Sequence, residues 1–512
     1  MQELHSPEQA AQWLRARVTG ALRTDSRQLR AGDGFIAWPG AASDARLYVS
    51  AALAQGASAC IVEKTGLENL SLQGESLACY EGLKAASGLI AAAYFGQPSS
   101  QLDVLAVTGT NGKTSTAWWL AQALSRLKPA RPCGLVGTLG MGRVGMSGDA
   151  LAGLVSTGLT TPDPVLFQQT LHRFVLDGLQ ACALEASSIG LQEHRLDGTR
   201  IRTAIFTNFT QDHLDYHGTM AAYWQAKAAL FDWPDLKAAV VNVDDEQGVA
   251  LAQTLAHRPL DLWTVSVSAP ARLQAQDIAL GHRGLRFTVC EGDESHVLET
   301  ALIGSFNVSN LLGVIAAMRT LGVALGDAVA ACADLRSVPG RMELIDSQDG
   351  GGAAIELPLV AVDYAHTPDA LTKALQALRP LAVQRGGRLW CVFGCGGGRD
   401  ALKRPLMGVV AAKEADKVVV TSDNPRFEKP EAIISQILLG LEGDAKVNVQ
   451  SDRALAIAQT LAEAHANDIV LLAGKGHEKA QEVAGVRHPF SDSLHAQLAL
   501  QRRIVSKSGE RA

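Results

Sequence analysis

The sequence predicts an α/β protein of three domains, and three observations support this prediction. Short β-branched runs recur along the chain, and each precedes a Gly-rich turn and an Ala/Leu-rich helical stretch, as in parallel sheets with crossover helices. The length of 512 residues is more than one hydrophobic core usually serves. With 47% hydrophobic and 19% charged residues, the composition is that of a globular protein with a sizeable core.

The first domain is expected over residues 1–100. Residues 1–18 mix acidic and basic side chains and predict an amphipathic helix; they lack the apolar segment of a secretory signal, so we expect a cytoplasmic protein. Residues 35–40 and 60–64 predict strands. The turn-rich residues 95–101 precede a new strand and therefore mark the end of this domain.

The central domain is expected over residues 101–337 and the last domain over residues 338–512. A helical stretch over residues 316–335 ends at the break Pro339-Gly340, which marks the boundary between them. Strand–loop–helix units are predicted to start near residues 102, 203, 238, 388, 416 and 468. In open α/β sheets, ligands bind at the carboxyl ends of the strands, so the loops of these units are expected to form the site.

Charge, hydropathy and cysteine spacing exclude several classes of protein. The 46 Lys and Arg against 52 Asp and Glu give a formal net charge of −6, so the chain lacks the basic field that nucleic acid or an anionic membrane surface would need. No apolar run reaches the roughly 18 residues of a membrane span, so no membrane insertion is expected. The 8 cysteines stand singly, without the paired spacing of a zinc site, and predict reduced thiols.

A phosphate-binding loop is predicted at residues 107–116, VTGTNGKTST, between a strand and a helix. Small residues let backbone N–H groups approach phosphate oxygens, Lys113 can reach the outer phosphates, and Thr114 can place its hydroxyl on Mg²⁺. Val107 stands where a strict Walker A motif has glycine, so the loop is a shortened variant; the structural alternative is a tight turn that happens to contain Gly-Lys. The loop residues predicted to contact the nucleotide are Gly109, Thr110, Asn111, Gly112, Lys113, Thr114 and Ser115.

Acids and histidines farther along the chain are candidates for binding a metal beside this loop. Glu185 follows an apolar run and is expected at a strand end, where its carboxylate can join a magnesium shell; the alternative is a helix-capping or surface carboxylate. Residues 212–217 contain two acids and two histidines. His213 is a candidate magnesium ligand, whereas His217 could simply fill a turn.

Lys227 stands between two aromatic residues at helical spacing. Tyr223, Lys227 and Phe231 are four residues apart and are expected on one helical face. Taken alone, this pattern predicts a lysine whose stem packs between aromatic rings while its ammonium group reaches solvent.

Ten motifs stand in an order and spacing that covers most of the chain. They are TGTNGKT (108–114), EASS (185–188), NFTQDHLD (208–215), AK (226–227), GSFN (304–307), PGRME (339–343), VDYAHTP (362–368), GCGGGRD (394–400), DNPR (423–426) and GKGHE (474–478). In these motifs, and from residue 25 onward, the chain resembles the Mur ligases, the ATP-dependent amide-forming enzymes of peptidoglycan precursor synthesis. The DNPR motif resembles the form that accepts meso-2,6-diaminopimelate rather than L-lysine.

The resemblance implies a fold, an activity and partners. The expected fold is an N-terminal UDP-binding α/β domain, a central P-loop ATPase-like domain with a mostly parallel sheet, and a C-terminal Rossmann-like domain that binds the amino acid. The expected reaction joins meso-2,6-diaminopimelate to UDP-N-acetylmuramoyl-L-alanyl-D-glutamate through an acyl phosphate, with ATP and Mg²⁺. A monomer is expected, with neither nucleic acid nor a membrane as a partner.

The resemblance also assigns residues. Lys227 matches the family lysine that CO₂ converts to a carbamate, which would bind magnesium as a carboxylate does. Thr114, Glu185 and His213 match the other magnesium positions, so the catalytic residues are expected to be Lys113, Glu185, His213 and Lys227. Further matches are the nucleotide contacts Asn307, Arg341 and Asp363, the UDP-muramoyl-dipeptide contacts Ser26, Thr160, Thr161, Ser187 and Arg195, and the diaminopimelate contacts Arg399, Asp423, Asn424, Pro425, Arg426, Gly474 and Glu478.

The chemistry of the last group suits a substrate with two amines and two carboxylates. Arg426 can bind a carboxylate through two hydrogen bonds and Glu478 can hold an ammonium group, whereas lysine would lack the distal carboxylate. Three alternatives remain: the same ligase type using L-lysine, a ligase like folylpolyglutamate synthase, which would not need the N-terminal domain or DNPR, and a nucleotide-switched binding module. The last would leave Glu185, His213 and Lys227 without a role.

Overall fold

The computed structural model describes residues 1–40, 43–145, 151–281, 284–345, 357–441 and 447–509. The chain divides into two compact units. The first comprises Met1–Phe209, Ala221–Leu273 and Gly313–Ala331, and the second Thr210–Met220, Gln274–Leu312 and Cys332–Ala512. Within the described ranges, none of the helices combines the length and apolarity that a bilayer crossing requires. The boundaries expected near residues 100 and 337 stay a prediction.

The first unit begins with a parallel sheet whose strands follow the order β1-β5-β4-β3-β2. Its strands are β1 (Gln2–Leu4), β2 (Leu22–Arg23), β3 (Gly34–Ala37), β4 (Ala59–Glu63) and β5 (Leu77–Tyr80), and its helices are α1 (Pro7–Arg15), α2 (Val49–Ala54) and α3 (Leu83–Tyr94). The helix expected over residues 1–18 is therefore shorter: Ser6 caps it by accepting a hydrogen bond from the Gln9 N–H, and Pro7 occupies its first turn. Strand β1 precedes it because residues 2–4 pair with β5, about 75 residues away.

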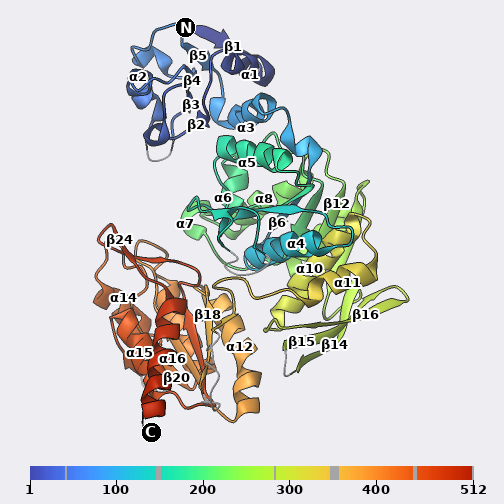
Figure 1. Ribbon diagram of the computed structural model, residues 1–512, viewed down its shortest axis with the longest axis vertical. Coiled ribbons are helices and arrows are strands. Elements are labelled where there is room, and N and C mark those ends of the chain that lie inside the picture. Colours follow the sequence, from blue (N-terminus) through green and yellow to red (C-terminus); the bar gives the residue numbers. More distant parts are fainter. Residues whose placement is uncertain (41–42, 146–150, 282–283, 346–356, 442–446, 510–512) are drawn as a thin grey trace. The chain divides into compact units, whose positions relative to one another are not determined.

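A second sheet in this unit carries the phosphate-binding loop. Its strands are β6 (Asp103–Thr108), β7 (Cys133–Gly137), β8 (Gly140–Gly142), β9 (Leu154–Val155), β10 (Ala181–Glu185), β11 (Thr203–Phe206), β12 (Ala238–Asn242) and β13 (Asp261–Ser266). Its helices are α4 (Lys113–Arg126), α5 (Pro164–Leu176), α6 (Ser188–Gln192), α8 (Met220–Ala228) and α9 (Glu246–Leu255). The order β13-β12-β11-β6-β10-β7 is parallel, and β8 and β9 add antiparallel edges. Because β6 lies between β10 and β11 and all three are parallel, their carboxyl ends meet at one edge. Figure 1 labels β6 and α4, the strand and the helix that the phosphate-binding loop joins.

The second unit contains an antiparallel segment that the sequence does not predict. Strands β14 (Leu273–Gly281), β15 (Gly284–Glu291) and β16 (Glu294–Thr300) pair in sequence order. The short helix α7 (Leu214–His217) also belongs to this unit. The prediction of one helical stretch over residues 316–335 is wrong, because α10 (Phe306–Thr320) and α11 (Leu325–Ala333) are separate helices. Gly322 between them has φ +81°, a left-handed conformation that ends a helix.

A third sheet, also in the second unit, carries the predicted amino-acid loops. Its strands are β17 (Glu343–Leu344), β18 (Leu359–Asp363), β19 (Leu389–Phe393), β20 (Lys417–Val420), β21 (Val447–Val449) and β22 (Ile469–Ala473), in the order β17-β18-β22-β19-β20-β21. All neighbours are parallel except β17. The helices are α12 (Pro368–Arg385), α13 (Lys403–Glu414), α14 (Pro430–Leu438), α15 (Arg453–Glu463) and α16 (Asp492–Gly509), and β23 (Ala480–Val483) and β24 (Val486–Pro489) form a hairpin.

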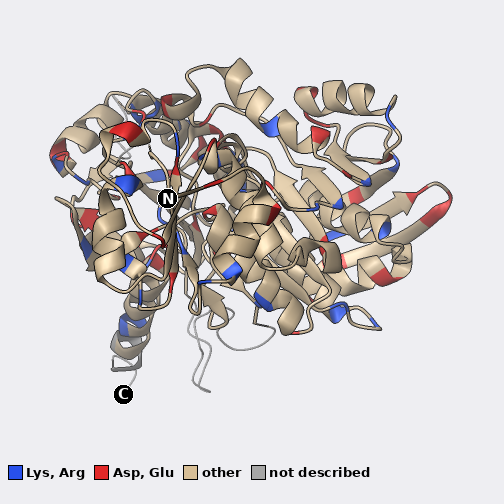
Figure 2. Cartoon of the chain, turned by 90° about the horizontal axis from the view of Figure 1, so that it is seen from above, with Lys and Arg blue, Asp and Glu red and all other residues tan. Residues whose placement is uncertain are grey.

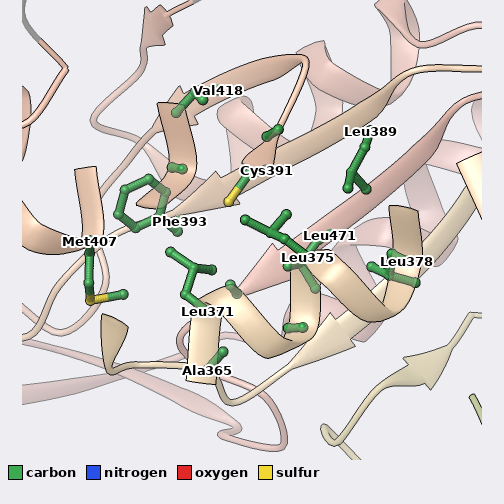
Figure 3. Packing of buried hydrophobic residues seen from close by; sticks show 14 of the residues in the cluster. Ala365, Leu371, Leu375, Leu378, Leu389, Cys391, Phe393, Met407, Val418 and Leu471 are labelled. Atoms are coloured by element: carbon green, nitrogen blue, oxygen red, sulfur yellow. The ribbon is translucent and has the colours of Figure 1, made fainter. Parts of the chain in front are cut away.

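Helix α12 anchors one face of this sheet. Figure 3 shows its leucines Leu371 and Leu375 directed toward Cys391 and Phe393 of β19, and all four side chains are fully buried. Burying one such leucine or phenylalanine contributes roughly 1.5–3 kcal/mol relative to exposure. This packing holds the parallel strands in register, so that the loops after β18, β19, β20 and β22 leave the sheet at the same edge.

Charged residues and cysteines are spread along the chain. Lys and Arg residues are interspersed with Asp and Glu residues along the ribbon (Figure 2). All eight cysteines are free thiols, and only Cys290 is not buried. The α/β fold class with mostly parallel sheets is confirmed, and reduced cysteines stay a prediction.

Candidate active site

The phosphate-binding loop joins β6 to α4 and depends on glycine at two positions. Gly109 has φ +145° and Gly112 has φ +84°, conformations that side chains other than glycine rarely adopt. A Cβ atom on Gly109 would also clash with the Thr207 hydroxyl. The loop therefore closes tightly and directs the first N–H groups of α4 toward the space above β6, as phosphate binding requires.

The end of β11 holds this loop in shape. The Thr110 N–H donates to the Asn208 carbonyl over 2.8 Å, and the Asn111 N–H donates to the Asn208 side-chain oxygen over 2.9 Å. The Thr207 hydroxyl donates to the Asn111 carbonyl over 2.6 Å. Lys113 folds over the loop, with Nζ 2.8 Å from the carbonyl oxygens of both Gly109 and Thr110. Asn208 was not among the predicted site residues, although it stands in one of the motifs.

Glu185 ends β10 and is 1% exposed. Its Oε2 accepts hydrogen bonds from the hydroxyls of Thr114 (2.9 Å) and Thr138 (3.2 Å), and its Oε1 accepts one from the Thr138 N–H (2.8 Å). Both structural alternatives for Glu185, a helix cap and a surface carboxylate, are therefore wrong. Gly137 is required beside it, because a Cβ there would clash with Oε1. Thr138 is a site residue that the sequence did not predict.

Lys227 is also 1% exposed, so the prediction of an ammonium group in solvent is wrong. Its Nζ donates to the Gly109 carbonyl over 2.7 Å and lies 4.4 Å from the centre of the Tyr223 ring. The Tyr223 hydroxyl donates to the Thr110 hydroxyl over 3.2 Å. The face of α8 that carries Tyr223 and Lys227 thus packs on the phosphate loop, while Phe231 lies beyond the helix end, in the hydrophobic core.

The predicted muramoyl-dipeptide residues of the central sheet gather near the end of β10. The Thr161 hydroxyl donates to the Glu185 carbonyl over 2.8 Å and lies 3.0 Å from the Ser187 hydroxyl. Arg195 donates to the Thr161 carbonyl over 3.0 Å, and the Thr160 hydroxyl lies 3.1 Å from the Thr138 hydroxyl. Ser26 lies elsewhere, half-buried in the 3-10 turn Ser26–Gln28 beside the first sheet.

The remaining nucleotide and metal candidates belong to the second unit. His213 has φ +52°, its side chain is 41% exposed, and its Nε2 lies 3.5 Å from a carboxylate oxygen of Asp212. Asn307, at the start of α10, is buried and donates to the Ile303 carbonyl over 2.7 Å. His213 and Asn307 therefore both make these contacts with residues of the second unit.

Arg341 and Asp363 lie near one another around Tyr364. The guanidinium carbon of Arg341 is 4.2 Å from the centre of the Tyr364 ring. Asp363 ends β18 and accepts hydrogen bonds from the N–H groups of Met342 (2.7 Å) and Ala365 (2.8 Å). Burial raises the pKa of the Asp363 carboxyl, and the nearby Arg341 charge and these N–H groups oppose the rise.

The loops after β20 and β22 bring two predicted diaminopimelate residues into contact. Asn424 Nδ2 donates to Glu478 Oε2 over 2.7 Å. Gly474 has φ +111°, and a Cβ there would meet a carboxylate oxygen of Asp423 at 2.5 Å. Asp423 is buried, which raises the pKa of its carboxyl. The turn residue Pro425 links Asn424 to Arg426.

The two predicted arginines differ in how firmly they are held. Arg426 has φ +52°, and its Nη1 donates to the Gly397 carbonyl over 2.6 Å. Its Nε lies 3.4 Å from a Glu482 carboxylate oxygen. The Arg399 side chain is 58% exposed. Lys475, which the sequence did not predict as a site residue, is fully buried between these loops.

Two family profiles match the chain. One, described as the Mur ligase middle domain, matches residues 107–318, and the other, described as the Mur ligase glutamate ligase domain, matches residues 340–476. The chain belongs to the Mur ligase family. The resemblance seen in the sequence is thereby confirmed.

Relatives of this Mur ligase are similar over nearly their whole length. A UDP-N-acetylmuramoyl-L-alanyl-D-glutamate–2,6-diaminopimelate ligase of Acidovorax sp. (strain JS42) is 62% identical over 501 residues, 97% of each chain. One of Pseudomonas aeruginosa is 45% identical, over 94% of each chain. A solved structure of a ligase of the same name is 36% identical and covers 94% of this chain and 95% of its own, with a TM-score of 0.64. MurF ligase from Thermotoga maritima in complex with ADP shares the fold at 18% identity, over 96% and 99% of the two chains, with a TM-score of 0.63.

Proposed function

We propose that this Mur ligase joins meso-2,6-diaminopimelate to UDP-N-acetylmuramoyl-L-alanyl-D-glutamate, with conversion of ATP to ADP and phosphate, in peptidoglycan precursor synthesis. The observation that carries the proposal is the 62% identity with the ligase named for this reaction, over 97% of both chains. The match therefore extends over nearly the whole of both chains.

The phosphate loop would bind and orient the triphosphate of ATP. Its N–H groups and the positive end of α4 would bind the phosphate oxygens, and Lys113, already folded over the loop, would neutralise charge on the transferring phosphoryl group. The γ-carboxylate of D-glutamate would attack the γ-phosphate to give an acyl phosphate and ADP. The amine would then displace inorganic phosphate, so no protein nucleophile is needed.

The residues around Glu185 fit Mg²⁺. The carboxylate of Glu185 and the hydroxyls of Thr114 and Thr138 are oxygen donors, the type that Mg²⁺ prefers, and phosphates and water usually complete such a site. Bound Mg²⁺ would neutralise negative charge on the phosphates. We assign Thr114 and Glu185 to magnesium binding, and His213 stays a prediction from the family resemblance.

Lys227 would add a carboxylate to this site as a carbamate. Its Nζ lies against the Gly109 carbonyl, at the base of the phosphate loop, and the side chain is shielded from solvent. The ammonium group would first lose a proton. Reaction of the neutral amine with CO₂ would then form an N–C bond and release a second proton, so that an anion replaces a cation. The two donors Glu185 and Lys227 would then flank the phosphate loop from β10 and from α8.

Release of ADP with different amino acids tests the proposal. We expect release only when both diaminopimelate and UDP-N-acetylmuramoyl-L-alanyl-D-glutamate are present. Equal release with L-lysine would favour the lysine-adding ligase, and release with L-glutamate and a folate acceptor would favour a folylpolyglutamate synthase. Nucleotide binding without release under any of these conditions would favour the nucleotide-switched module and contradict the proposal.

A further inference from the structure

Lys475 follows Gly474 in the loop after β22 and is 0% exposed. Its Nζ donates three hydrogen bonds: to Asn424 Oδ1 (3.0 Å), to Glu478 Oε2 (2.9 Å) and to the Ala480 carbonyl (2.8 Å). An ammonium group has three protons, so each proton has one acceptor. A lysine buried in this way is costly unless it is fully paired, and here the pairing joins the loops after β20 and β22.

The same contacts fix the orientation of the Asn424 amide. Its Oδ1 accepts from Lys475 and from the Glu482 N–H (3.0 Å), so its Nδ2 faces Glu478 Oε2. Both ends of the amide are therefore engaged within the protein. Rotating the amide by 180° would place its NH₂ group against the Lys475 ammonium and the Glu482 N–H, which are donors.

The two oxygens of Glu478 differ as a result. Oε2 accepts from both Asn424 and Lys475, whereas no residue in the described part of the chain donates to Oε1. The Glu478 side chain is 29% exposed, so a ligand can reach it. One oxygen thus fixes the carboxylate and the other is left to accept a hydrogen bond from a ligand.

We propose that Lys475 is a positioning residue for the amino-acid substrate: it fixes Asn424 and Glu478 so that Oε1 of Glu478 accepts the ammonium group of a diamino acid. This inference rests on the proposed function. Lys475 also forms an ion pair with Glu478. We place the second carboxylate of the substrate at Arg426.

The ionisation of Glu478 gives a second readout. Burial raises the pKa of its carboxyl, but the Lys475 charge and the hydrogen bonds from Lys475 and Asn424 more than offset this and lower it. His477 on the same loop, Asp423 after β20, Tyr364 after β18 and Arg453 of α15 are the other titratable groups facing it. Without Lys475 the pKa rises, so Glu478 becomes protonated at a higher pH and loses its ability to bind an ammonium group there.

Lys475→Met tests the proposal, with Lys479→Met as a matched control, because Lys479 is exposed and four residues away. In Lys475→Met we expect the KM for diaminopimelate to rise about ten-fold or more, by analogy with sites whose buried polar groups lose a partner. The KM values for ATP and for the UDP-linked substrate should change less than about two-fold. The acid limb of kcat/KM for diaminopimelate should move to higher pH, and the control should match the wild type.

Each outcome bears on the proposal. An unchanged KM for diaminopimelate, or an equal rise in all three KM values, would overturn it. If the methionine variant does not fold, Lys475→Gln, which keeps a polar end without the charge, should give the same KM pattern; failure of both variants to fold would make Lys475 a structural residue and overturn the proposal. A wild-type enzyme inactive with diaminopimelate would instead contradict the proposed function.

Discussion

At the scale of single residues, burial decides what the lysine of α8 can do. Lys227 is shielded by Tyr223 and held by the Gly109 carbonyl, so its amine lies at a fixed distance of 2.7 Å from the phosphate loop. A side chain held in this way can serve as a metal-binding carbamate without the entropy loss that a flexible surface lysine would suffer.

Lys227→Ala should lower kcat by about 100-fold or more, since it removes the side chain to which we assign the carbamate, and with it a negative charge near the transferring phosphoryl group. Acetate or bicarbonate in excess should restore part of the rate, because a small anion can occupy the space left by the side chain. Steady-state ADP release measures both effects. Lys237→Ala, at an exposed lysine before β12, is the control, and a rate in Lys227→Ala equal to that of the control would remove the carbamate from the mechanism.

Arg426→Asn should raise the KM for diaminopimelate about 30-fold and leave that for ATP nearly unchanged. Asparagine tolerates the left-handed backbone at φ +52°, so the variant removes the guanidinium with little backbone strain. A charge-assisted hydrogen bond contributes roughly 1.5–3 kcal/mol, which corresponds to that change. Initial rates with each substrate varied in turn provide the measurement, with exposed Arg487→Asn as the control. Equal effects on both KM values would place Arg426 outside the amino-acid pocket.

At the scale of elements, one buried ion pair ties two helices to two strand ends. Arg453 begins α15 and Asp492 begins α16; both side chains are 0% exposed, and they pair at 2.7 Å. Arg453 also donates to the Ala473 carbonyl of β22 (2.8 Å) and to the Ser422 carbonyl after β20 (3.3 Å). The bases of the two amino-acid loops are therefore fixed by the same guanidinium group.

Arg453→Met should lower the free energy of unfolding by about 3–5 kcal/mol, because Asp492 is left as a buried charge without a partner. The double variant with Asp492→Leu should recover much of this loss of stability. In both variants the KM for diaminopimelate should be raised, since the carbonyls of Ser422 and Ala473 lack their donor. Urea unfolding and initial rates separate the two effects. As a control, Arg379→Met breaks a more exposed pair with Asp416 and should lower the free energy of unfolding by less than about 1 kcal/mol. Equal decreases in Arg379→Met and Arg453→Met would contradict the larger contribution expected from the buried pair.

At the scale of the whole molecule, the sequence predicts features whose signal is local. The strands β6, β19 and β22 are found because each joins an apolar run to a Gly-rich turn within a few residues. Strand β1 is missed because only its pairing with β5 makes residues 2–4 a strand. The meander β14–β16 is missed although β15 alternates buried and exposed residues, because its strands pair antiparallel in sequence order and none belongs to a strand–loop–helix unit.

Some residues of the candidate site stand in sequence motifs, whereas others reach the site only through the folded structure. Glu185 and the phosphate loop stand in motifs that the sequence displays, whereas Thr138 acts through a backbone N–H that no motif marks. It reaches Glu185 because β7 and β10 pair in parallel with Val136 opposite Leu184, a register that only the folded sheet provides. Lys475 is missed for a related reason: its burial, and hence its pairing with Glu478, depends on the loop after β20.

Acid sensitivity is expected from histidines of the second unit. Burial lowers the pKa of His366 and of His477 from 6.5 to about 4, with the Lys403 charge adding to the effect at His366 and the Arg341 charge at His477. Between pH 6.5 and pH 4 these histidines bind protons in the unfolded chain but not in the folded chain. Their contribution to the free energy of unfolding is therefore fully present above pH 6.5 and is lost as the pH drops toward 4. The raised pKa values of Asp363 and Asp423 act in the opposite direction and offset part of this loss.

His477→Gln should therefore make stability less dependent on pH. The wild-type imidazole accounts for about 2 kcal/mol of stability lost between pH 7.5 and pH 5, since a group with these two pKa values is protonated almost only in the unfolded chain at pH 5. Urea unfolding at both pH values should show that loss reduced by about this amount in His477→Gln. The control His488→Gln, at an exposed position on β24, should follow the wild type. If His477→Gln lost as much stability as the wild type, burial of this imidazole would not be a source of the acid sensitivity.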